Sequence, residues 1–518
     1  AMATIEVTAG TFKKNPAKYV VEGSAVKTND DGTFGVEKAY LAKVGETSYY
    51  TMDEAFHAAL DSGEPLCLLR DYTTNSPQNS GSKNLTIDLG GHTWTYTGTD
   101  TDCAAFEINF SDVTLTVKNG TVISNSMVGL IPSAMNSTIT YNNSALVFEG
   151  VTMTANGHSG IETNGSNTND NVTLINSTLN VPNGYGIYFP SSGTLTINNS
   201  VINAKTMGVQ VCAGSLNIVG ENSAITVSDG PVEKTENVGA IEDGAAISVI
   251  YRPGYKALET VKVEAGRFTS KTGNNALKAY EWKDMTESAF DNTKGTIAVS
   301  GGTFTTAVSE DYCADGFIPT QNEDGSYGVK EGEYVAQVLD ADGNFVQAYE
   351  TLAEAFDNVE TGYTVRLLKN ITLTEQINIV KALNGLTLDG NGYTITCATT
   401  TDPMQSGGSA LYFGNANDKL YCTGIKIKDL TMEGTARFAI FLCGGTSTEF
   451  TNVKISGNYY IAVNLYGTHG AVMTNCDISN SNTITTDKYV SAIWSNVSSA
   501  NPLVLNNTKV SSIAINTY

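Results

Sequence analysis

The chain contains the same series of short segments twice, roughly 300 residues apart. Each copy holds a strand segment ending in TF, a DG turn before an aromatic residue, and a Thr-x-x-Glu helix start. The matching pairs are Thr4–Phe12 with Thr296–Phe304, Asp31–Val36 with Asp324–Val329, and Thr51–Phe56 with Thr351–Phe356. Such a long period is typical of tandem modules. We therefore expect residues 1–38 to be the end cap of a preceding module, 39–330 a complete module with its own C-terminal cap, and 331–518 a second module that is incomplete at its C-terminus.

A shorter period runs inside each module. An apolar-x-Asn pattern recurs at Asn176 and Asn199, 23 residues apart, and then, 23, 23 and 32 residues apart, at Asp429, Asn452, Asn475 and Asn507. A period of about 20 to 25 residues with short apolar segments is typical of a β-solenoid, in which no coil can bury its own face. Asn suits a chain corner and can hydrogen-bond its counterpart on the next coil. We expect these residues to form a structural ladder.

A second short strand follows each Asn corner. Segments such as YGIYF from Tyr185, FAIFL from Phe438 and IAVNL from Ile461 place an aliphatic residue before one of a different type. Because side chains alternate across a strand, the aliphatic residue should point inward and its successor outward. Strands of neighbouring coils stack about 4.8 Å apart. The outward residues of successive coils should therefore form a line along one face.

The start of each module predicts a helix. Thr51 with Glu54, and Thr351 with Glu354, have the spacing of a capping box. Each would open a short amphipathic helix with Phe56 or Phe356 on its apolar side. Such a helix would cover the first coil, whose edge strands and apolar surface would otherwise be exposed.

Composition excludes several classes of partner and site. The 30 basic residues against 53 acidic ones give a net charge of −23, which argues against nucleic acid, an anionic membrane or an acidic polysaccharide as partner. No apolar run is long enough to insert into a membrane. The eight cysteines show no metal-site or redox spacing, so we expect buried free thiols at Cys212, Cys443 and Cys476, and no metal or cofactor.

The coils with aligned Asn corners resemble the right-handed parallel β-helix of the pectate-lyase-like superfamily. The resemblance implies an all-β fold of tandem β-helix modules with short amphipathic capping helices. The boundary segments VSGGTFTTAVSEDYCADGFIPTQNEDGSYGV and YETLAEAFDNVETGYTVRLLKNITLTEQINI resemble those of large surface proteins of gut-dwelling anaerobic bacteria. This second likeness implies an extracellular, cell-wall-associated protein. A β-helix by itself does not specify an activity.

Enzymatic patterns of this superfamily are weak in the chain. Its polysaccharide lyases use calcium-binding carboxylates and a basic residue, whereas this chain has only five scattered arginines. An inverting glycoside hydrolase needs two carboxyl groups about 6.5 to 9.5 Å apart. Glu107 and Glu162 occupy equivalent outward positions, which we expect to lie two coils and about 10 Å apart, with His158 and Asp170 nearby. This pair is the alternative catalytic candidate in a chain that otherwise favours a non-enzymatic role.

The outward positions favour binding instead. In the second module they are Tyr412, Phe441, Asn464 and Trp494, and the first module adds Tyr188. Aromatic rings along one face form an apolar surface on which sugar rings or an extended polypeptide can lie. The alternative is that a neighbouring loop covers these residues, or that they are isolated exposed rings without a function. We therefore expect a monomeric rod acting as an adhesin or a spacer, with a glycan or a host surface or mucosal protein as partner. The alternative is a carbohydrate-active enzyme of the glycoside hydrolase type.

Overall fold

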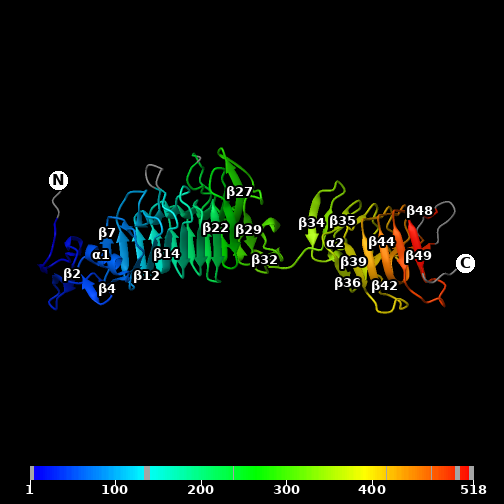
Figure 1. The fold of residues 1–518 in the computed structure, drawn as a ribbon, viewed down its shortest axis with the longest axis horizontal. Helices are drawn as coiled ribbons and strands as arrows, with labels where there is room; N and C mark the ends of the chain where they lie inside the picture. The colour runs from blue at the N-terminus through cyan, green and yellow to red at the C-terminus, as the bar shows by residue number, and fades with distance from the viewer. Residues whose placement is uncertain are drawn as a thin grey trace. The chain divides into compact units, whose positions relative to one another are not determined.

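The computed structural model describes residues 5–133, 140–236, 238–415, 417–467, 470–495 and 502–512. The chain divides into two compact units, Ala1–Glu331 and Gly332–Tyr518. In each unit, short strands stack one on another along the axis of the unit (Figure 1). Most strand pairs are parallel and join consecutive coils. Examples are β10 (Thr93–Tyr96) with β12 (Thr114–Ser124), and β42 (Thr431–Cys443) with β44 (Lys454–Tyr466).

The first unit has three faces. Face I is a nine-stranded sheet of β8 (Gln78–Asn79), β11 (Ala104–Glu107), β13 (Met127–Ile131), β15 (Ser159–Thr163), β18 (Tyr185–Phe189), β21 (Met207–Val211), β24 (Ile247–Tyr251), β27 (Leu277–Lys283) and β28 (Thr286–Ala289). Face II contains β6 (Leu66–Leu68), β9 (Leu85–Asp88), β12 (Thr114–Ser124), β14 (Ala145–Ala155), β16 (Asn171–Ile175), β19 (Thr194–Asn198), β22 (Gly214–Val219), β25 (Leu258–Val263) and β29 (Thr296–Val299). Face III contains β7 (Tyr72–Thr74), β10 (Thr93–Tyr96), the second halves of β12 and β14, β17 (Thr178–Val181), β20 (Val201–Ala204), β23 (Ala224–Val227), β26 (Arg267–Thr269) and β30 (Thr303–Phe304).

The second unit repeats these faces with fewer coils. Face I contains β37 (Ile377–Ile379), β40 (Leu411–Phe413), the second halves of β42 (Thr431–Cys443) and β44 (Lys454–Tyr466), and β47 (Ser491–Ser495). Face II contains β35 (Thr364–Leu367), β38 (Thr387–Asp389), β41 (Lys426–Lys428), β43 (Glu449–Thr451), β45 (Val472–Thr474) and β48 (Val504–Asn506). Face III contains β36 (Ile371–Leu373), β39 (Thr394–Ala398), the first halves of β42 and β44, β46 (Asp477–Asn480) and β49 (Lys509–Ser512).

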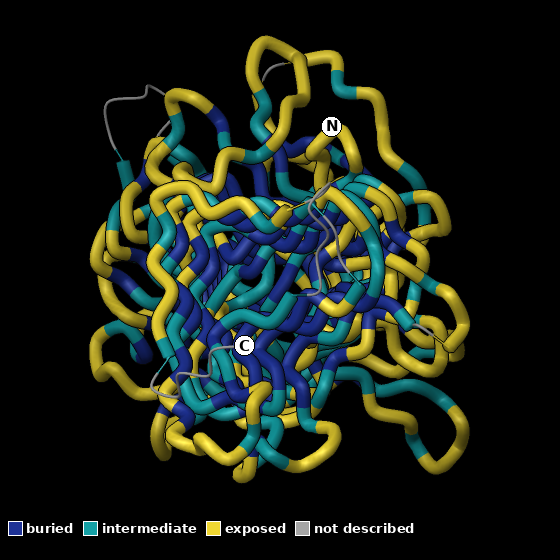
Figure 2. Tube along the Cα trace, turned by 90° about the vertical axis from the view of Figure 1, so that its right-hand side faces the viewer, coloured by how far each residue is buried: buried dark blue, intermediate teal, exposed yellow. Residues whose placement is uncertain are grey.

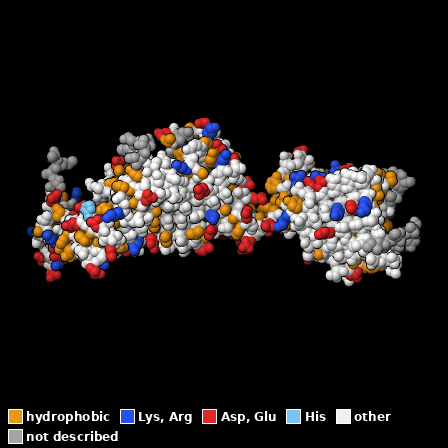
Figure 3. Space-filling model, viewed as in Figure 1, with side chains coloured by type: hydrophobic (Ala, Val, Ile, Leu, Met, Phe, Trp, Pro, Cys, Tyr) orange, Lys and Arg blue, Asp and Glu red, His pale blue; other side chains and the backbone are white. Residues whose placement is uncertain are grey.

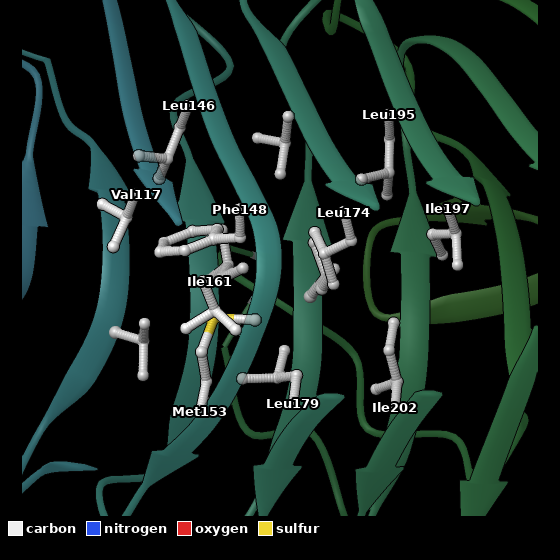
Figure 4. Packing of buried hydrophobic residues seen from close by; sticks show 14 of the residues in the cluster. Val117, Leu146, Phe148, Met153, Ile161, Leu174, Leu179, Leu195, Ile197 and Ile202 are labelled. Atoms are coloured by element: carbon white, nitrogen blue, oxygen red, sulfur yellow. The ribbon is translucent and has the colours of Figure 1, made fainter. Parts of the chain in front are cut away.

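The core is a continuous stack of inward-facing aliphatic and aromatic side chains. Leu174 in β16 pairs in register with Ile197 in β19, and both are fully buried. Figure 4 shows these residues beside Phe148 in successive coils, and Figure 2 shows buried backbone enclosed by exposed turns. Each buried aliphatic side chain contributes about 1.5–3 kcal/mol relative to an exposed one. The predicted all-β, parallel β-helix fold is confirmed.

Both predicted capping helices are present. Helix α1 (Met52–Ser62) begins after Thr51, whose side chain accepts a hydrogen bond from the Glu54 amide, and α2 (Leu352–Asp357) has a complete capping box. Phe356 is buried, and Phe56 packs against the core of the first unit. The helices therefore cover apolar surface where the parallel coils of each unit begin, as the sequence predicts.

The repeat in the sequence is also a repeat in structure. Near the start, β1 (Gly10–Phe12), a 3-10 turn (Ala17–Tyr19), β2 (Ser24–Thr28) and β3 (Phe34–Lys38) follow one another. The same order returns from the last strand of face III onward as β30, a 3-10 turn (Glu310–Tyr312), β31 (Phe317–Gln321) and β32 (Tyr327–Glu331). In the first copy Thr33 donates to Asp31, and in the second Ser326 donates to Asp324. An antiparallel hairpin also precedes the capping helix in each unit. These hairpins are β4 (Ala42–Val44) with β5 (Thr47–Tyr49), and β33 (Ala336–Leu339) with β34 (Phe345–Tyr349).

The predicted Asn ladder exists at the corner between faces II and III of the second unit. The side-chain amide of Asn452 donates to Asp429 at 2.8 Å, that of Asn475 to Asn452 at 3.4 Å, and that of Asn507 to Asn475 at 2.8 Å. All four residues have positive φ, which Asn and Asp tolerate better than most residues. The ladder therefore satisfies the side chains where the backbone turns.

The first unit departs from this expectation at the equivalent corner. Asn176 and Asn199 have positive φ there, but the side chain of Asn199 donates to Asn198 instead. Ser177 and Ser200, one residue further on, make the link between coils, since the Ser177 amide donates to the Ser200 hydroxyl at 3.0 Å. A serine ladder thus replaces the predicted asparagine ladder.

Other expectations concern cysteines and membranes. Cys212, Cys443 and Cys476 are buried and unbridged, as predicted. In the part of the chain that the structure describes, neither α-helix has the length and hydropathy to cross a membrane.

Replacing Asn452 tests what the ladder contributes. Asn452→Ala removes two side-chain hydrogen bonds and places alanine, which tolerates a left-handed conformation less well than asparagine, at a positive φ, so we expect a loss of about 2–4 kcal/mol in the free energy of unfolding. Asn452→Gly removes the same bonds without that conformational cost and should lose less. Denaturant unfolding measures both variants. Equal stability of wild type and both variants would contradict a stabilising ladder.

Candidate functional site

The outward line of face I in the second unit has the predicted register. Tyr412 pairs with Phe441, Phe441 with Asn464, and Asn464 with Trp494. These four residues occupy successive coils of β40, β42, β44 and β47. The structure therefore brings them together on one sheet, as the alternation of the strands predicts.

The rings of Tyr412, Phe441 and Trp494, together with that of Tyr466, form a row of nearly parallel aromatic groups. The ring centroids of Tyr412 and Phe441 are 4.3 Å apart with planes 9° apart. Tyr466 lies 6.2 Å from Phe441 and 6.0 Å from Trp494, with interplanar angles of 20° and 16°. We call Tyr412, Phe441, Tyr466 and Trp494 the aromatic strip. Its rings share one orientation although they come from four different strands.

Exposure differs along the strip. Phe441 and Asn464 are only 8% and 6% exposed, whereas Tyr412 and Trp494 are half-buried. The expectation that Phe441 and Asn464 lie open on the surface is therefore wrong. Phe441 is covered because Tyr412 and Phe438, whose ring centroid lies 5.2 Å away, pack against it. Phe441 and Asn464 therefore support the more exposed rings of the strip and do not form its contact surface.

The exposed ring is Tyr466, which the outward positions taken from the sequence missed. It is 49% exposed and lies two residues after Asn464, on the same side of β44. The strand alternation could have identified it, because residues two apart share a face.

A shallow hollow continues from Tyr466. Tyr421, which is 42% exposed, borders it with Tyr466, over a floor formed by Cys443, Gly444, Gly445, Thr446 and Gly467, and its volume is about 280 Å³. A Cβ on Gly444 would lie 2.2 Å from the Tyr421 ring, so only glycine allows that ring to approach the backbone. Two exposed tyrosines thus border one recess next to the strip.

Face I of the first unit also has the predicted register. Glu107 pairs with Leu130, Leu130 with Glu162, and Glu162 with Tyr188. Glu107 and Glu162 are therefore two coils apart, as expected. The next outward residues are Gln210, Ser248 and Lys278.

The two glutamates differ in environment. Glu107 is 8% exposed, and its carboxylate accepts a hydrogen bond from the Ala104 amide at 2.9 Å. Glu162 is half-buried, accepts a 2.6 Å hydrogen bond from the Tyr185 hydroxyl, and borders a surface hollow. The sequence predicts two equivalent outward carboxylates. In the structure only Glu162 borders that hollow.

Tyr188 is covered, which matches the alternative that a neighbouring loop covers the outward aromatic residues and not its assignment as a ligand-binding residue. It is 6% exposed because Ala240, Ile241 and Tyr255 pack over this part of face I. Ala240 and Ile241 belong to the loop between β23 and β24, which we call the covering loop and which the structure describes at residues 228–236 and 238–246. The Tyr188 hydroxyl lies 3.1 Å from that of Tyr255, and burial raises its pKa above the ordinary tyrosine value. Gln210 holds the loop down, donating to the Ile241 carbonyl and accepting from the Ile241 amide.

His158 and Asp170 have separate surroundings. His158 Nε2 lies 2.8 Å from Glu242 of the covering loop, and its ring packs edge-on against Tyr185. Asp170 is fully buried at a chain corner, where it accepts hydrogen bonds from the Ser144 amide and the Ser191 hydroxyl. Burial raises the pKa of Asp170 to about 7. Asp170 is therefore a corner residue, and His158 helps to hold the covering loop.

The described ranges contain no cluster of side chains that could bind a metal ion. No three His, Cys, Asp or Glu side chains of these residues lie close enough to hold one ion. On the face seen in Figure 3, acidic and basic side chains are interspersed and form no broad basic patch.

Comparison with known proteins gives distant likenesses only. No family model and no curated protein matches the chain. Among solved structures, the catalytic domain of a GH87 alpha-1,3-glucanase in complex with nigerose has a TM-score of 0.26 and 11% identity, over 84% of this chain and 72% of that one. The PL6 family alginate lyase AlyGC has a TM-score of 0.21 and 10% identity, over 89% and 88%. At these values the likeness does not extend to a site or an activity.

The buried carboxyl of Asp170 predicts a pH effect on stability. Its pKa in the folded state, about 7, lies above its ordinary value of 3.8. The contribution of the protonated side chain to the free energy of unfolding is therefore full below pH 4 and is lost as the pH rises through 7. Asp170→Asn removes this loss. We expect the melting temperature of wild type, relative to Asp170→Asn, to fall by about 2 °C or more between pH 4 and pH 8.

Asp229 supplies the control for this measurement. It is half-buried, and a hydrogen bond donated by Lys271 lowers its pKa. Its contribution should therefore appear as the pH rises above its ordinary pKa, and Asp229→Asn should show a small trend of the opposite sign. If the difference in melting temperature between wild type and Asp170→Asn does not change with pH, the proposed titration of Asp170 is contradicted.

Proposed function

We propose that the chain is part of an extracellular, cell-wall-associated tandem β-helix protein whose second unit binds a glycan along the aromatic strip. The observation that carries this proposal is the parallel alignment of Tyr466 with Phe441 and Trp494, with the Tyr466 ring half exposed. Sugar rings present C–H faces that pack on aromatic rings, and the half-exposed ring of Tyr466 within this stacked apolar row offers such a contact.

The surroundings of the strip favour an uncharged glycan. Arg437 lies over the Tyr460 ring at 4.5 Å, and the Tyr460 hydroxyl donates to Asp487 at 3.2 Å. The positive charge of Arg437 and the negative charge of Asp487 therefore offset each other beside the strip. The net charge of −23 also disfavours acidic polysaccharides at long range. A neutral host or dietary glycan, or a glycoprotein that carries one, fits this balance best.

The caps and corners support the rest of the proposal. Repeated, capped units of stacked coils form rods that can hold a binding surface away from a cell wall. The boundary segments favour a bacterial surface protein of the gut, acting as a monomeric adhesin. The alternative is a spacer built from the same rods, in which the aromatic strip binds no ligand.

A glycoside hydrolase is the second candidate function. The position of Glu162 at the edge of a hollow of about 440 Å³ favours it. A hydrolase also needs a second carboxyl group. The Glu107 carboxylate is buried and hydrogen-bonded to its own strand, which makes it a poor partner.

Removing exposed rings tests the binding proposal. Tyr466→Ala and Trp494→Ala should each weaken binding to a neutral glycan on an array by about tenfold, which corresponds to about 1.4 kcal/mol. Phe345→Ala is the matched control, because Phe345 is an exposed aromatic residue of β34 and lies outside the strip. Equal binding by all three variants would reject the strip, and no binding by folded wild type would favour the spacer.

Turnover tests the second candidate. If unit 1 is a hydrolase, Glu162→Gln should reduce the release of reducing sugar from neutral polysaccharides by at least about 100-fold, because it removes a catalytic carboxyl. The glutamine can still accept the Tyr185 hydrogen bond, so the fold should persist. Wild-type protein that releases no sugar from any neutral polysaccharide tested would count against this candidate.

A further inference from the structure

The hollow beside Glu162 in the first unit has walls from three separate segments. They are residues 163–166 at the end of β15 and after it, residues 238–239 of the covering loop, and Gly254–Tyr255 after β24, while Glu162 and Tyr188 lie on adjacent coils of face I. Its volume of about 440 Å³ lies in the usual range for small-ligand sites, about 300–1,000 Å³. Segments far apart in the sequence thus converge on one recess.

The walls are fixed by buried interactions. Arg252 is 3% exposed, and its guanidinium donates to the Gly239 carbonyl at 2.7 Å and to the Tyr188 hydroxyl at 3.4 Å. The same guanidinium lies 4.8 Å from the centre of the Tyr255 ring. One buried cation therefore ties together the covering loop, the sheet and the Tyr255 wall. A recess that is already formed loses little entropy when a ligand enters.

The chemistry of the lining selects the ligand. Glu162 is the only charged side chain among the described lining residues, and one of its oxygens already accepts from Tyr185. The remaining lone pairs of the carboxylate can accept hydroxyl donors. Asn164, Ser166 and the phenol of Tyr255 add donors and acceptors, and the Tyr255 ring adds an apolar surface.

The charges around the hollow argue against a simple inorganic ion as its ligand. A single carboxylate is a weak site for a divalent cation, which prefers six or more oxygen ligands. An anion would meet the Glu162 carboxylate, and the nearby guanidinium of Arg252 is buried and already paired. A neutral ring with several hydroxyl groups suits both the polar groups and the aromatic wall.

We propose that this hollow binds a neutral sugar residue, with Glu162 accepting hydroxyl donors and Tyr255 packing against the ring. The site is independent of the aromatic strip, because it lies in the other unit and presents mainly polar groups. The sequence analysis named Glu162 and Tyr188 for different roles, and the structure places both at the same recess. Tyr188 forms part of its lining, and its hydroxyl meets that of Tyr255.

Gly165 offers a way to fill the hollow without strain. Its φ is not positive, and a Cβ there would meet Pro190 at 3.5 Å and Tyr255 at 3.8 Å, both ordinary contact distances. Gly165→Leu should therefore occupy the recess while the fold persists. Glu162→Gln removes the charge, and Phe110→Ala is the control, since Phe110 is exposed on the same unit and does not line the hollow.

The experiment is saturation-transfer NMR of the full chain with the methyl glycosides of glucose, galactose, mannose and N-acetylglucosamine. We expect at least one to give signals with wild type and Phe110→Ala, and Gly165→Leu and Glu162→Gln to weaken the affinity by at least about tenfold. Signals that persist in folded Gly165→Leu, or no signal from any of the four sugars with wild type, would overturn the proposal. Tighter binding of methyl glucosaminide, a cation, would overturn the assignment to a neutral ligand.

These outcomes are separable from those for the strip. Tyr466 is in the second unit, so loss of array binding in Tyr466→Ala reports on the strip alone. Loss of saturation transfer in Gly165→Leu reports on the hollow alone.

Discussion

Coil-on-coil stacking is the interaction on which the rest of the structure depends. Each coil has apolar residues facing inward that it cannot bury by itself, and its strands have unpaired backbone groups on both edges. The next coil satisfies both needs when its strands fall in register, as β16 and β19 do. This requirement fixes the short sequence period, the residues at the corners and the presence of capping helices. It leaves the outward residues of face I free to vary, and the two units differ most there.

The sequence predicts the parts of the molecule that depend on neighbours in the chain or on the next coil. Thr351 with Glu354, and Asn452 with Asp429 and Asn475, follow from local spacing, and the structure contains those interactions. Exposure was harder to predict, because it depends on segments that return from elsewhere. Tyr188 is outward on its strand, yet a loop some 40 residues later covers it. The serine link at Ser177 and Ser200 shows that a corner can be satisfied by a neighbouring residue.

The two candidate sites share a scaffold and differ in chemistry. In the second unit, buried Phe441 supports half-exposed rings that stack on one another, so the surface is mainly apolar. In the first unit, the covering loop and Tyr255 convert the same face into a polar recess around Glu162. A long insertion between two strands is enough to make this difference, because it adds walls without changing the register of the coils beneath. Function on such a scaffold is therefore determined by loops and outward residues.

The direction of the inter-coil hydrogen bonds has a mechanical consequence. Strands run across the axis of each unit, so the bonds between coils point along it. A pull along the axis loads these bonds in tension, one coil at a time, instead of shearing many of them together. Each unit should then lengthen under force by peeling coils from an end, with the capping helix and hairpin as the first parts to give way.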